Sequence, residues 1–184
     1  YIYLGKNNLN IKGISYKFIL DYTSWLKEKD QSNFYPLLSL NDLRDFDLNT
    51  VSGNIYFLIV KTSDLEVIKD LNIPENFVLI LNSTNEHFMP DMRAFFMKNH
   101  FSKNPIILSQ SYDFNYSDKL IVHSSTDNGG LFIQGFGDGI FIDNNSSDIK
   151  EIKKINNLSF KILQAARVRV TSTDFISCPS CGRT

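Results

Sequence analysis

Residues 54–81, NIYFLIVKTSDLEVIKDLNIPENFVLIL, contain one full repeat of the pattern that decides the fold. The first part, Asn54–Val60, is an apolar run of β-forming residues, which is typical of a strand buried on both faces. Ser63 or Asp64 is a suitable N-cap for the helix that follows. The apolar stripe of this helix comprises Leu65, Ile68 and Leu71. Phe77–Leu81 is the next apolar run, so the stretch predicts a strand, a helix and a strand.

The same alternation continues towards the carboxyl terminus. Pro90 suits the first turn of a helix that runs to His100. The inner side of this helix is expected to carry Met92, Phe95, Phe96 and His100. Residues 105–108, PIIL, begin the third unit, and Ser117 to about Asp127 is expected to form a looser helix.

Glycine-rich segments punctuate the next part of the chain. Asn128-Gly129-Gly130 is interpreted as a turn before a fourth strand at 131–133, and residues 139–142 predict a further short strand. Between them lies Gly135-Phe-Gly137-Asp138-Gly139, in which glycine permits a tight turn and Asp138 is expected to stabilise it. A strand rather than a helix follows these glycines, so the segment is not a dinucleotide-binding fingerprint.

The spacing of the predicted strands indicates the fold class. They begin near residues 55, 77, 106 and 131, roughly two dozen residues apart, which is the spacing of β/α units that feed a parallel sheet or barrel. Four units correspond to about half of an eightfold barrel. We therefore expect an α/β protein with an incomplete (β/α) barrel-like domain of parallel strands.

The amino-terminal 50 residues show a weaker pattern. Tyr1–Gly5 (YIYLG) is apolar and extended, a helix is possible from Tyr16 to Lys29, and the remainder is loop-like. The chain has no initiator Met, and it stops three residues after a cysteine pair. We expect both ends to be truncations of a longer protein.

The last helix has the strongest pattern. Ser147 is expected to be its N-cap, and Asp148 and Glu151 lie in the first turn, where the helix dipole favours acidic groups. Its apolar stripe comprises Ile149, Ile152, Ile155, Leu158, Ile162, Leu163 and Ala166. Residues 171–177 then form an extended segment that leads to the cysteines, which places a domain boundary near 168–172.

Composition excludes several classes of protein. The chain has 184 residues, 42% of them hydrophobic and 21% charged, with a formal net charge of −1. It has no basic excess that would indicate a nucleic-acid partner. It also lacks a run of about 18 apolar residues, which a membrane span requires. The two cysteines are too few for a secreted disulfide framework, so we expect a soluble protein in a reducing compartment.

The cysteine pair is the main candidate for chemistry. Cys178-Pro-Ser-Cys181 spaces two thiolates so that both reach one metal centre, but the motif alone leaves three readings open. A zinc site needs two more ligands, a thioredoxin-type pair needs a following helix, and an iron–sulfur site needs further ligands from elsewhere. His87, His100 and His123 lie singly and far upstream, and we interpret them as structural.

No free-standing catalytic centre is recognisable in the chain. The acidic residues at 42, 45, 47, 66, 70 and 127 form no spaced constellation, and no nucleophile elbow of the form GxSxG occurs. The cations nearest the cysteines are Arg167, Arg169 and Arg183, which we interpret as helix-capping or surface charges.

Three segments together carry a resemblance to a known family. Residues 159–184 read SFKILQAARVRVTSTDFISCPSCGRT, residues 127–143 read DNGGLFIQGFGDGIFID, and residues 105–130 read PIILSQSYDFNYSDKLIVHSSTDNGG. They resemble 4-hydroxy-3-methylbut-2-enyl diphosphate synthase, in its long plant- and plastid-type form with three domains. The resemblance is clear from about residue 105 to the end, and thinner from 54 to 104.

The resemblance implies the domain organisation and the metal site. Residues 1–170 would be part of an inserted TIM-barrel-like domain, and residues 171–184 the start of a cluster-binding domain. In the family a [4Fe–4S] cluster is held by three Cys and a Glu, of which the first two thiolates correspond to Cys178 and Cys181. The remaining ligands would lie beyond residue 184. The inserted domain would be structural, because short forms of the family lack it.

The resemblance also implies an activity. The family carries out the reductive ring opening and dehydration of methylerythritol cyclodiphosphate in isoprenoid biosynthesis, with electrons from ferredoxin or flavodoxin. We expect this chain alone to be inactive, the full-length protein to be a homodimer, and its location to be a plastid-type organelle. The alternatives are a β/α scaffold or interaction module with half a zinc site, and then an independent dithiol oxidoreductase.

Overall fold

A computed structural model describes most of the chain. It covers residues 1–5, 17–28, 32–46, 54–98, 103–113, 115–144, 146, 148–170 and 172–173. The expected helix positions His100 and Ser147, and everything from residue 174 onwards, lie outside these ranges. The truncated cluster domain predicted at 171–184 therefore stays a prediction.

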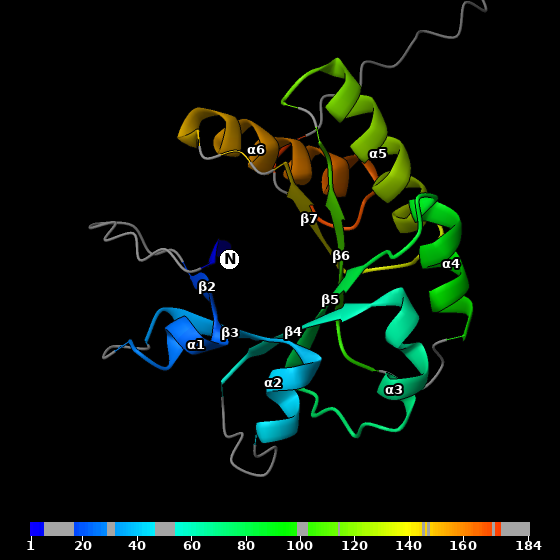
Figure 1. The fold of residues 1–184 in the computed structure, drawn as a ribbon. Helices are drawn as coiled ribbons and strands as arrows, with labels where there is room; N and C mark the ends of the chain where they lie inside the picture. Colours follow the sequence, from blue (N-terminus) through cyan, green and yellow to red (C-terminus); the bar gives the residue numbers. More distant parts are fainter. Residues whose placement is uncertain are drawn as a thin grey trace, which may run out of the picture.

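A single curled sheet of parallel strands forms the centre of the molecule (Figure 1). Its seven strands are hydrogen-bonded in sequence order, and each neighbouring pair is parallel. This confirms the predicted α/β, barrel-like class. The strands are β1 (Ile2–Gly5), β2 (Phe18–Asp21), β3 (Phe34–Leu38), β4 (Tyr56–Lys61), β5 (Phe77–Asn82), β6 (Ile106–Ser111) and β7 (Gly139–Asp143).

The helices lie on the outer face of the curled sheet (Figure 1). Each follows a strand and returns antiparallel to it, as parallel sheets require. They are α1 (Tyr22–Trp25), α2 (Leu40–Asp45), the 3-10 turn η2 (Thr62–Asp64), α3 (Leu65–Lys69), α4 (Phe88–Lys98), α5 (Asp118–Ile133) and α6 (Ile149–Ala165). Among the described residues, no helix combines the length and the apolar character needed to cross a membrane.

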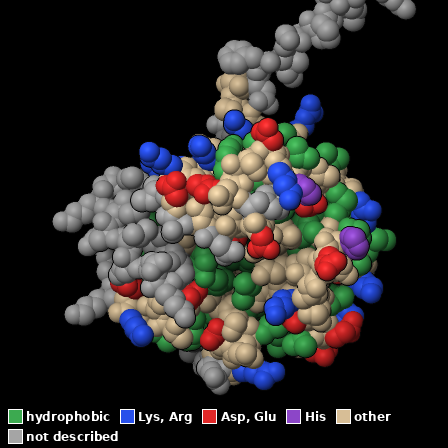
Figure 2. All heavy atoms as spheres, turned by 45° about the horizontal axis from the view of Figure 1, so that its top comes forward, with side chains coloured by type: hydrophobic (Ala, Val, Ile, Leu, Met, Phe, Trp, Pro, Cys, Tyr) green, Lys and Arg blue, Asp and Glu red, His purple; other side chains and the backbone are tan. Residues whose placement is uncertain are grey.

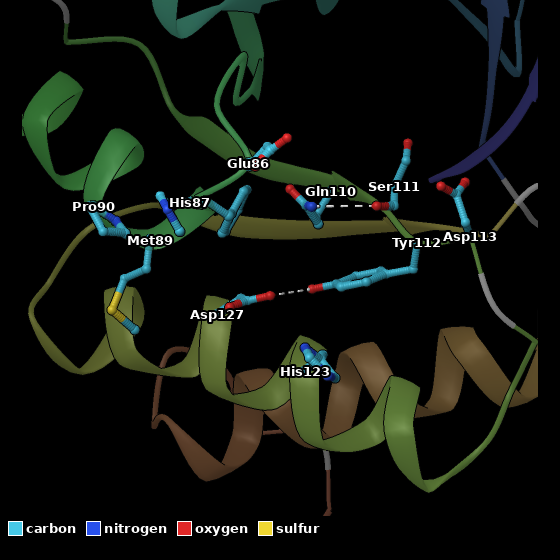
Figure 3. A pocket seen from close by; sticks show the side chains of 11 residues that line it. Glu86, His87, Met89, Pro90, Gln110, Ser111, Tyr112, Asp113, His123 and Asp127 are labelled. Carbon is cyan, nitrogen blue, oxygen red and sulfur yellow. Dashed lines mark hydrogen bonds between the residues drawn. The ribbon is translucent and has the colours of Figure 1, made fainter.

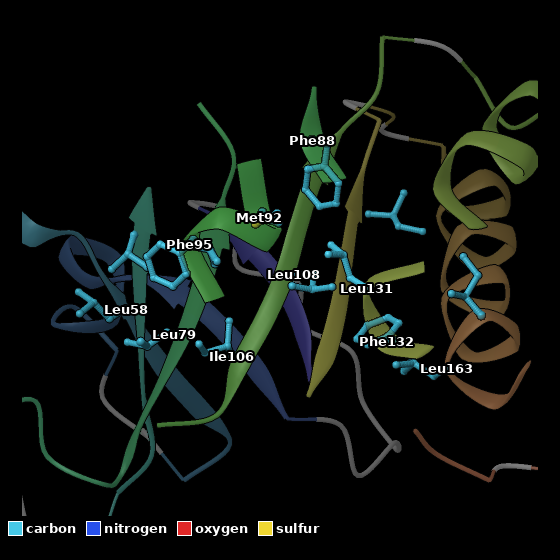
Figure 4. Close-up of a cluster of buried hydrophobic side chains, with 14 of the residues drawn as sticks. Leu58, Leu79, Phe88, Met92, Phe95, Ile106, Leu108, Leu131, Phe132 and Leu163 are labelled. Carbon is cyan, nitrogen blue, oxygen red and sulfur yellow. The ribbon is translucent and has the colours of Figure 1, made fainter. Parts of the chain in front are cut away.

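Burial on both faces explains the continuous apolar run of β4. Tyr56, Leu58 and Val60 point to the core between sheet and helices, whereas Phe57 and Ile59 point to the inside of the curl. Phe57 is 1% exposed and Leu58 is 0% exposed. Figure 4 shows the outer core, where helix residues such as Met92 and Leu131 cover Leu79 and Leu108.

Aromatic rings help to fill the inside of the curl. The ring of Tyr1 meets those of Tyr35 and Phe57 edge-on, at centroid distances of 5.0 and 5.2 Å. The rings of Tyr3 in β1 and Phe141 in β7 also meet, at 5.7 Å. In the described part of the chain, the two edge strands are therefore linked by side chains and not by a backbone ladder.

The amino-terminal third contains more sheet than the sequence pattern predicted. The extended segment at YIYLG is confirmed as β1. The expected helix from Tyr16 to Lys29 is wrong, because Phe18–Asp21 is β2 and only Tyr22–Trp25 is helical. β3 occupies a stretch that was expected to be loop. These strands are short, and pairing with their neighbours stabilises them where local propensity does not.

The expected strand at 131–133 and the turn before it are also wrong. α5 continues without interruption through residues 128–133. Gly130 allows close packing of α4 on α5, because an added Cβ would lie 2.3 Å from Met89 Cε. Asn128 is fully buried, and its Nδ2 donates to the Ser124 carbonyl at 3.0 Å. Gly130 therefore serves packing between two helices, and neither Gly129 nor Gly130 ends α5.

The turn between α5 and β7 matches its prediction. Gly135 and Gly137 have φ values of 81° and 84°, in the left-handed region that favours glycine. Asp138 holds the start of β6, because its Oδ2 accepts from Ile106 N at 2.8 Å while its own N donates to Ile106 O at 2.7 Å. Its role is structural, as expected.

The predicted last helix is confirmed, with two differences. Its N-cap is Asp148, whose Oδ1 accepts from Lys150 N at 3.0 Å. Ile155, Leu158, Ile162 and Leu163 of the apolar stripe are buried, whereas Ile152 is 44% exposed. In its first turn, the Glu151 carboxylate accepts from Tyr116 N, from Ser146 Oγ at 2.8 Å and from Asn144 Nδ2 at 2.9 Å. It thereby ties the loop before α5 to the loop before α6.

The glycines provide a test of the α5 assignment. Gly129→Ala is expected to stabilise the fold by about 0.5–1 kcal/mol, because alanine favours helix and the new Cβ has no atom within 4 Å. Gly137→Ala is the contrasting variant and should destabilise by more than about 1 kcal/mol. Its φ is +84° and the new Cβ would lie 2.8 Å from Leu108 Cγ. Urea unfolding measures both, and destabilisation by Gly129→Ala would contradict the helix.

Glu151 provides a pH-dependent test. The bond from Tyr116 N, followed by that from Ser146, lowers the pKa of this carboxyl group. A lowered pKa in the folded state adds stability above the unfolded pKa, which is lost as the pH falls through the folded pKa. Thermal unfolding should therefore show Glu151→Gln less stable than the parent at pH 7, with the difference shrinking below about pH 4. Glu66→Gln, which alters an exposed ion pair with Lys69, should show no such narrowing.

Candidate functional site

A hollow lies at the carboxyl end of β6, between the start of α4 and the middle of α5 (Figure 3). It is an open cavity of about 410 Å³ with a mostly polar lining. The side chains around it come from residues 86–90, which include the first turn of α4, from 110–113 and from two positions of α5, His123 and Asp127. The carboxyl ends of parallel strands are where α/β folds carry their ligands, so this hollow is the natural place to look for chemistry.

Tyr112 and Asp127 form the central pair of the hollow. The Tyr112 hydroxyl donates to Asp127 Oδ2 at 3.1 Å (Figure 3), and the tyrosine is only 5% exposed. Burial, and then the negative charge of Asp127, raise the pKa of Tyr112 well above its usual value. The phenol therefore stays protonated at physiological pH and acts as a hydrogen-bond donor, neither a base nor a nucleophile.

The two described histidines line the same hollow but form no metal site. His87 and His123 are both exposed, and the backbone N–H of His87 donates to Asn85 Oδ1 at 2.9 Å. Within the described ranges, no group of three or more His, Cys, Asp or Glu lies close enough to hold a metal ion. The face drawn in Figure 2 has interspersed acidic and basic side chains, in line with the net charge of −1.

Carboxylates near the ends of other strands accept hydrogen bonds that hold neighbouring segments together. Asp91 Oδ2 accepts from Thr62 Oγ1 and from Ser83 Oγ, both at 2.6 Å, and so joins the segments after β4 and β5. Asp21 Oδ1 accepts from the Tyr3 hydroxyl at 2.8 Å. Burial, and then the bond to Asp21, raise the pKa of Tyr3. These groups support the rim, and none is arranged as an acid–base pair.

The predicted metal ligands, Cys178 and Cys181, lie outside the described residues, as does Arg183. Arg167 and Arg169 are described and exposed just after α6. The Arg169 guanidinium lies 5.3 Å from the centroid of the Phe160 ring. Arg169 also lies near Tyr1, the residue before β1. The chain therefore leaves α6 near the amino-terminal end of β1, the end of the sheet opposite the hollow.

The donor set fits an iron–sulfur cluster only in part. Two thiolates are present in the sequence at 178 and 181, whereas such a cluster takes four protein ligands. The described carboxylates and imidazoles form no group that would complete the set. Cys178 and Cys181 alone would therefore leave such a cluster short of two ligands.

Sequence reasoning missed the side-chain pairs Tyr112–Asp127, Tyr3–Asp21 and Gln164–Ser172. A signal existed for Asp21 and Tyr112, since each stands at or directly after the last residue of a buried strand. The signal at Asp21 was overlooked because the segment was interpreted as a helix. The signal at Tyr112 was overlooked because an aromatic side chain was not considered as a polar group. No local signal marks Gln164, whose partner Ser172 follows eight residues later.

Comparison with known proteins supplies the context for these observations. No protein-family profile matches the chain. The 4-hydroxy-3-methylbut-2-en-1-yl diphosphate synthase (flavodoxin) of Phocaeicola vulgatus is 28% identical over 186 residues, covering 100% of this chain and 30% of that protein. The enzyme of the same name from Leptospira interrogans is 46% identical over 80 residues, 44% of this chain and 12% of its own. The chloroplastic ferredoxin form of Arabidopsis thaliana is 42% identical over 69 residues, 38% and 9% respectively.

The matches cover all of this chain but only part of each relative. Three further relatives of the same name, from other bacteria, are matched over 100% of this chain and 29–30% of their own length. The chain thus spans about 30% of the length of the curated relatives that it matches from end to end. It is a homologue of one segment of the 4-hydroxy-3-methylbut-2-en-1-yl diphosphate synthases, the family that its own motifs indicate.

Proposed function

We propose that the protein to which this chain belongs is a 4-hydroxy-3-methylbut-2-en-1-yl diphosphate synthase. It would catalyse the reductive ring opening and dehydration of methylerythritol cyclodiphosphate. Residues 1–170 would form its inserted barrel-like domain and residues 171–184 the start of its cluster-binding domain. The observation that carries this proposal is the end-to-end match of the chain to one segment of relatives that bear this name.

The role of residues 1–170 within that enzyme would be structural. The carboxylates of Asp91 in α4 and Glu151 in α6 accept hydrogen bonds from the loops beside them. Tyr112 is a protonated donor, and the described residues contain no metal-binding group. A barrel with this rim supports and spaces the neighbouring domains, and the isolated chain would be inactive.

Cys178 and Cys181 would be two of the protein ligands of a [4Fe–4S] cluster. When bound, the cluster would supply the single electrons that the reductive step needs. What this chain would contribute is the two thiolates of Cys178 and Cys181, which follow α6 in the sequence. The other ligands would lie in the part of the relatives that this chain does not match.

The partners follow from the same proposal. The names of the relatives specify flavodoxin or ferredoxin, and one of these would be the electron donor here. The substrate would be a small cyclic diphosphate, the full-length protein a homodimer, and neither nucleic acid nor membrane a partner. A plastid-type organelle is the proposed location, supported by the chloroplastic plant relative.

The decisive test is anaerobic iron–sulfur reconstitution of the full-length protein, read by iron analysis, visible absorbance and EPR. We expect about four irons per chain, and their loss in Cys178→Ser and in Cys181→Ser. Ser180→Ala is the matched control, because it changes one of the two residues between the thiols and keeps both thiols. Binding of one zinc ion and no iron would instead support the scaffold with a zinc site.

The structural role of the hollow is tested by Tyr112→Phe. This change removes the hydroxyl that bonds Asp127 and leaves the ring in place. We expect the free energy of unfolding to fall by about 0.5–1.5 kcal/mol, with kcat and KM of the reconstituted enzyme within about twofold of the parent. A loss of kcat of tenfold or more at unchanged iron content would show that the hollow takes part in catalysis.

A further inference from the structure

The chain leaves α6 through a defined hydrogen-bonded turn. Arg167 N donates to Gln164 O and Val168 N donates to Leu163 O, each at 2.9 Å. This pair of bonds is the Schellman pattern, in which the last carbonyls of a helix are satisfied by the residues that follow it. Arg169 N also points to Leu163 O, at 3.3 Å. The turn reverses the backbone directly after Ala166.

A side chain then fastens the emerging segment to the helix. The Gln164 amide Nε2 donates to Ser172 O at 3.1 Å, and its Oε1 accepts from Ser172 N and Ser172 Oγ, both at 3.0 Å. One amide thus makes three bonds to one residue. We name the described residues of this closed loop, 164–170 and 172, the exit elbow.

The backbone of the elbow is strained at one position. Arg167 has a φ of 58°, and it is the sole non-glycine residue with positive φ in the described chain. Glycine is the usual residue at this place in a Schellman turn, and other side chains cost about 1 kcal/mol there. Since arginine is disfavoured at this position of the turn, the three bonds between Gln164 and Ser172 are needed in addition to the backbone bonds of the turn to hold the elbow closed.

The elbow determines how far the cysteines can move from the barrel. Cys178 follows Ser172 by six residues and Ala166 by twelve. A residue spans at most about 3.5 Å, so Cys178 stays within about 20 Å of Ser172 when the elbow is closed and about 40 Å of Ala166 when it is open. Doubling the tether lowers the effective concentration of its end about threefold for a flexible chain, and about eightfold if it is fully extended.

We propose that Gln164 is a positioning residue, which through the exit elbow sets the point from which the Cys178–Cys181 segment leaves the barrel. This inference rests on the proposed function. Gln164 touches neither cluster nor substrate. It acts by shortening the tether, and so raises the fraction of time in which the cluster domain occupies its working position.

The test uses the full-length, iron-loaded protein with Gln164→Ala. Gln134→Ala is the matched control, because Gln134 also ends a helix but its Nε2 bonds to Gly130 O of that same helix, at 2.9 Å. Amide hydrogen exchange over residues 168–173 is the first readout. Gln164→Ala should speed exchange at Ser172 about tenfold or more, Ser172→Ala should have a smaller effect because two of the three bonds remain, and the control should have none.

Steady-state kinetics are the second readout. With iron content unchanged at about four per chain, Gln164→Ala should lower kcat about three- to eightfold. KM for the cyclodiphosphate should stay within about twofold. Ser172→Ala should lie between the parent and Gln164→Ala.

Three results would overturn the positioning role alone. The first is that Gln164→Ala leaves the exchange rate at Ser172 unchanged. The second is that exchange shows an open elbow but kcat equals that of Gln134→Ala. The third is that Gln164→Ala loses iron and does not lose kcat. By contrast, an unmutated protein that takes up no iron would overturn the proposed function, and the positioning role with it.

Discussion

Burial of the strands on both faces is the constraint on which the rest of the structure depends. A flat sheet would expose Phe57 and Ile80 to water, and each buried apolar side chain of this size contributes about 1.5–3 kcal/mol. Curling brings these residues together inside, while the helices cover Leu58 and Leu79 on the other face. The interior is then occupied by side chains, among them the ring of Tyr1 against Phe57. Chemistry is thereby confined to the rim or to segments outside the barrel.

The rim is occupied by structural carboxylates. In a catalytic barrel this edge carries reactive groups from several strands. Here Asp91 is shared by two hydroxyls, and Glu151 accepts bonds from both adjoining loops. The bond from Tyr116 N, followed by that from Ser146, lowers the pKa of the Glu151 carboxyl group, which makes it a poor proton acceptor at neutral pH. The contacts of Asp91 and Glu151 thus stiffen the loops at this edge of the sheet.

The sequence predicted the parts of the fold whose signal is local. Runs such as Asn54–Val60 are readable because two-sided burial leaves no polar alternation. β2 and β3 were missed because their four or five residues depend on pairing with neighbours, and α5 was cut short because Gly130 is explained only by Met89 of another helix. At the site, the cysteine motif and its flanks identified the family. The contact of Gln164 with Ser172 was not predictable. It depends on a left-handed turn at residue 167, and an arginine there does not indicate such a turn.

The strain at Arg167 bears on how firmly the elbow is closed. Hydrogen bonds between exposed groups contribute at most about 0.5–1.5 kcal/mol each. The three at Ser172 are opposed by about 1 kcal/mol for the left-handed backbone of Arg167 and by the conformational entropy lost when the intervening residues are fixed. The balance is a small net stability. A connection of this kind opens far more easily than the barrel unfolds, so the exit elbow limits the tether without joining the cysteine segment rigidly to the sheet.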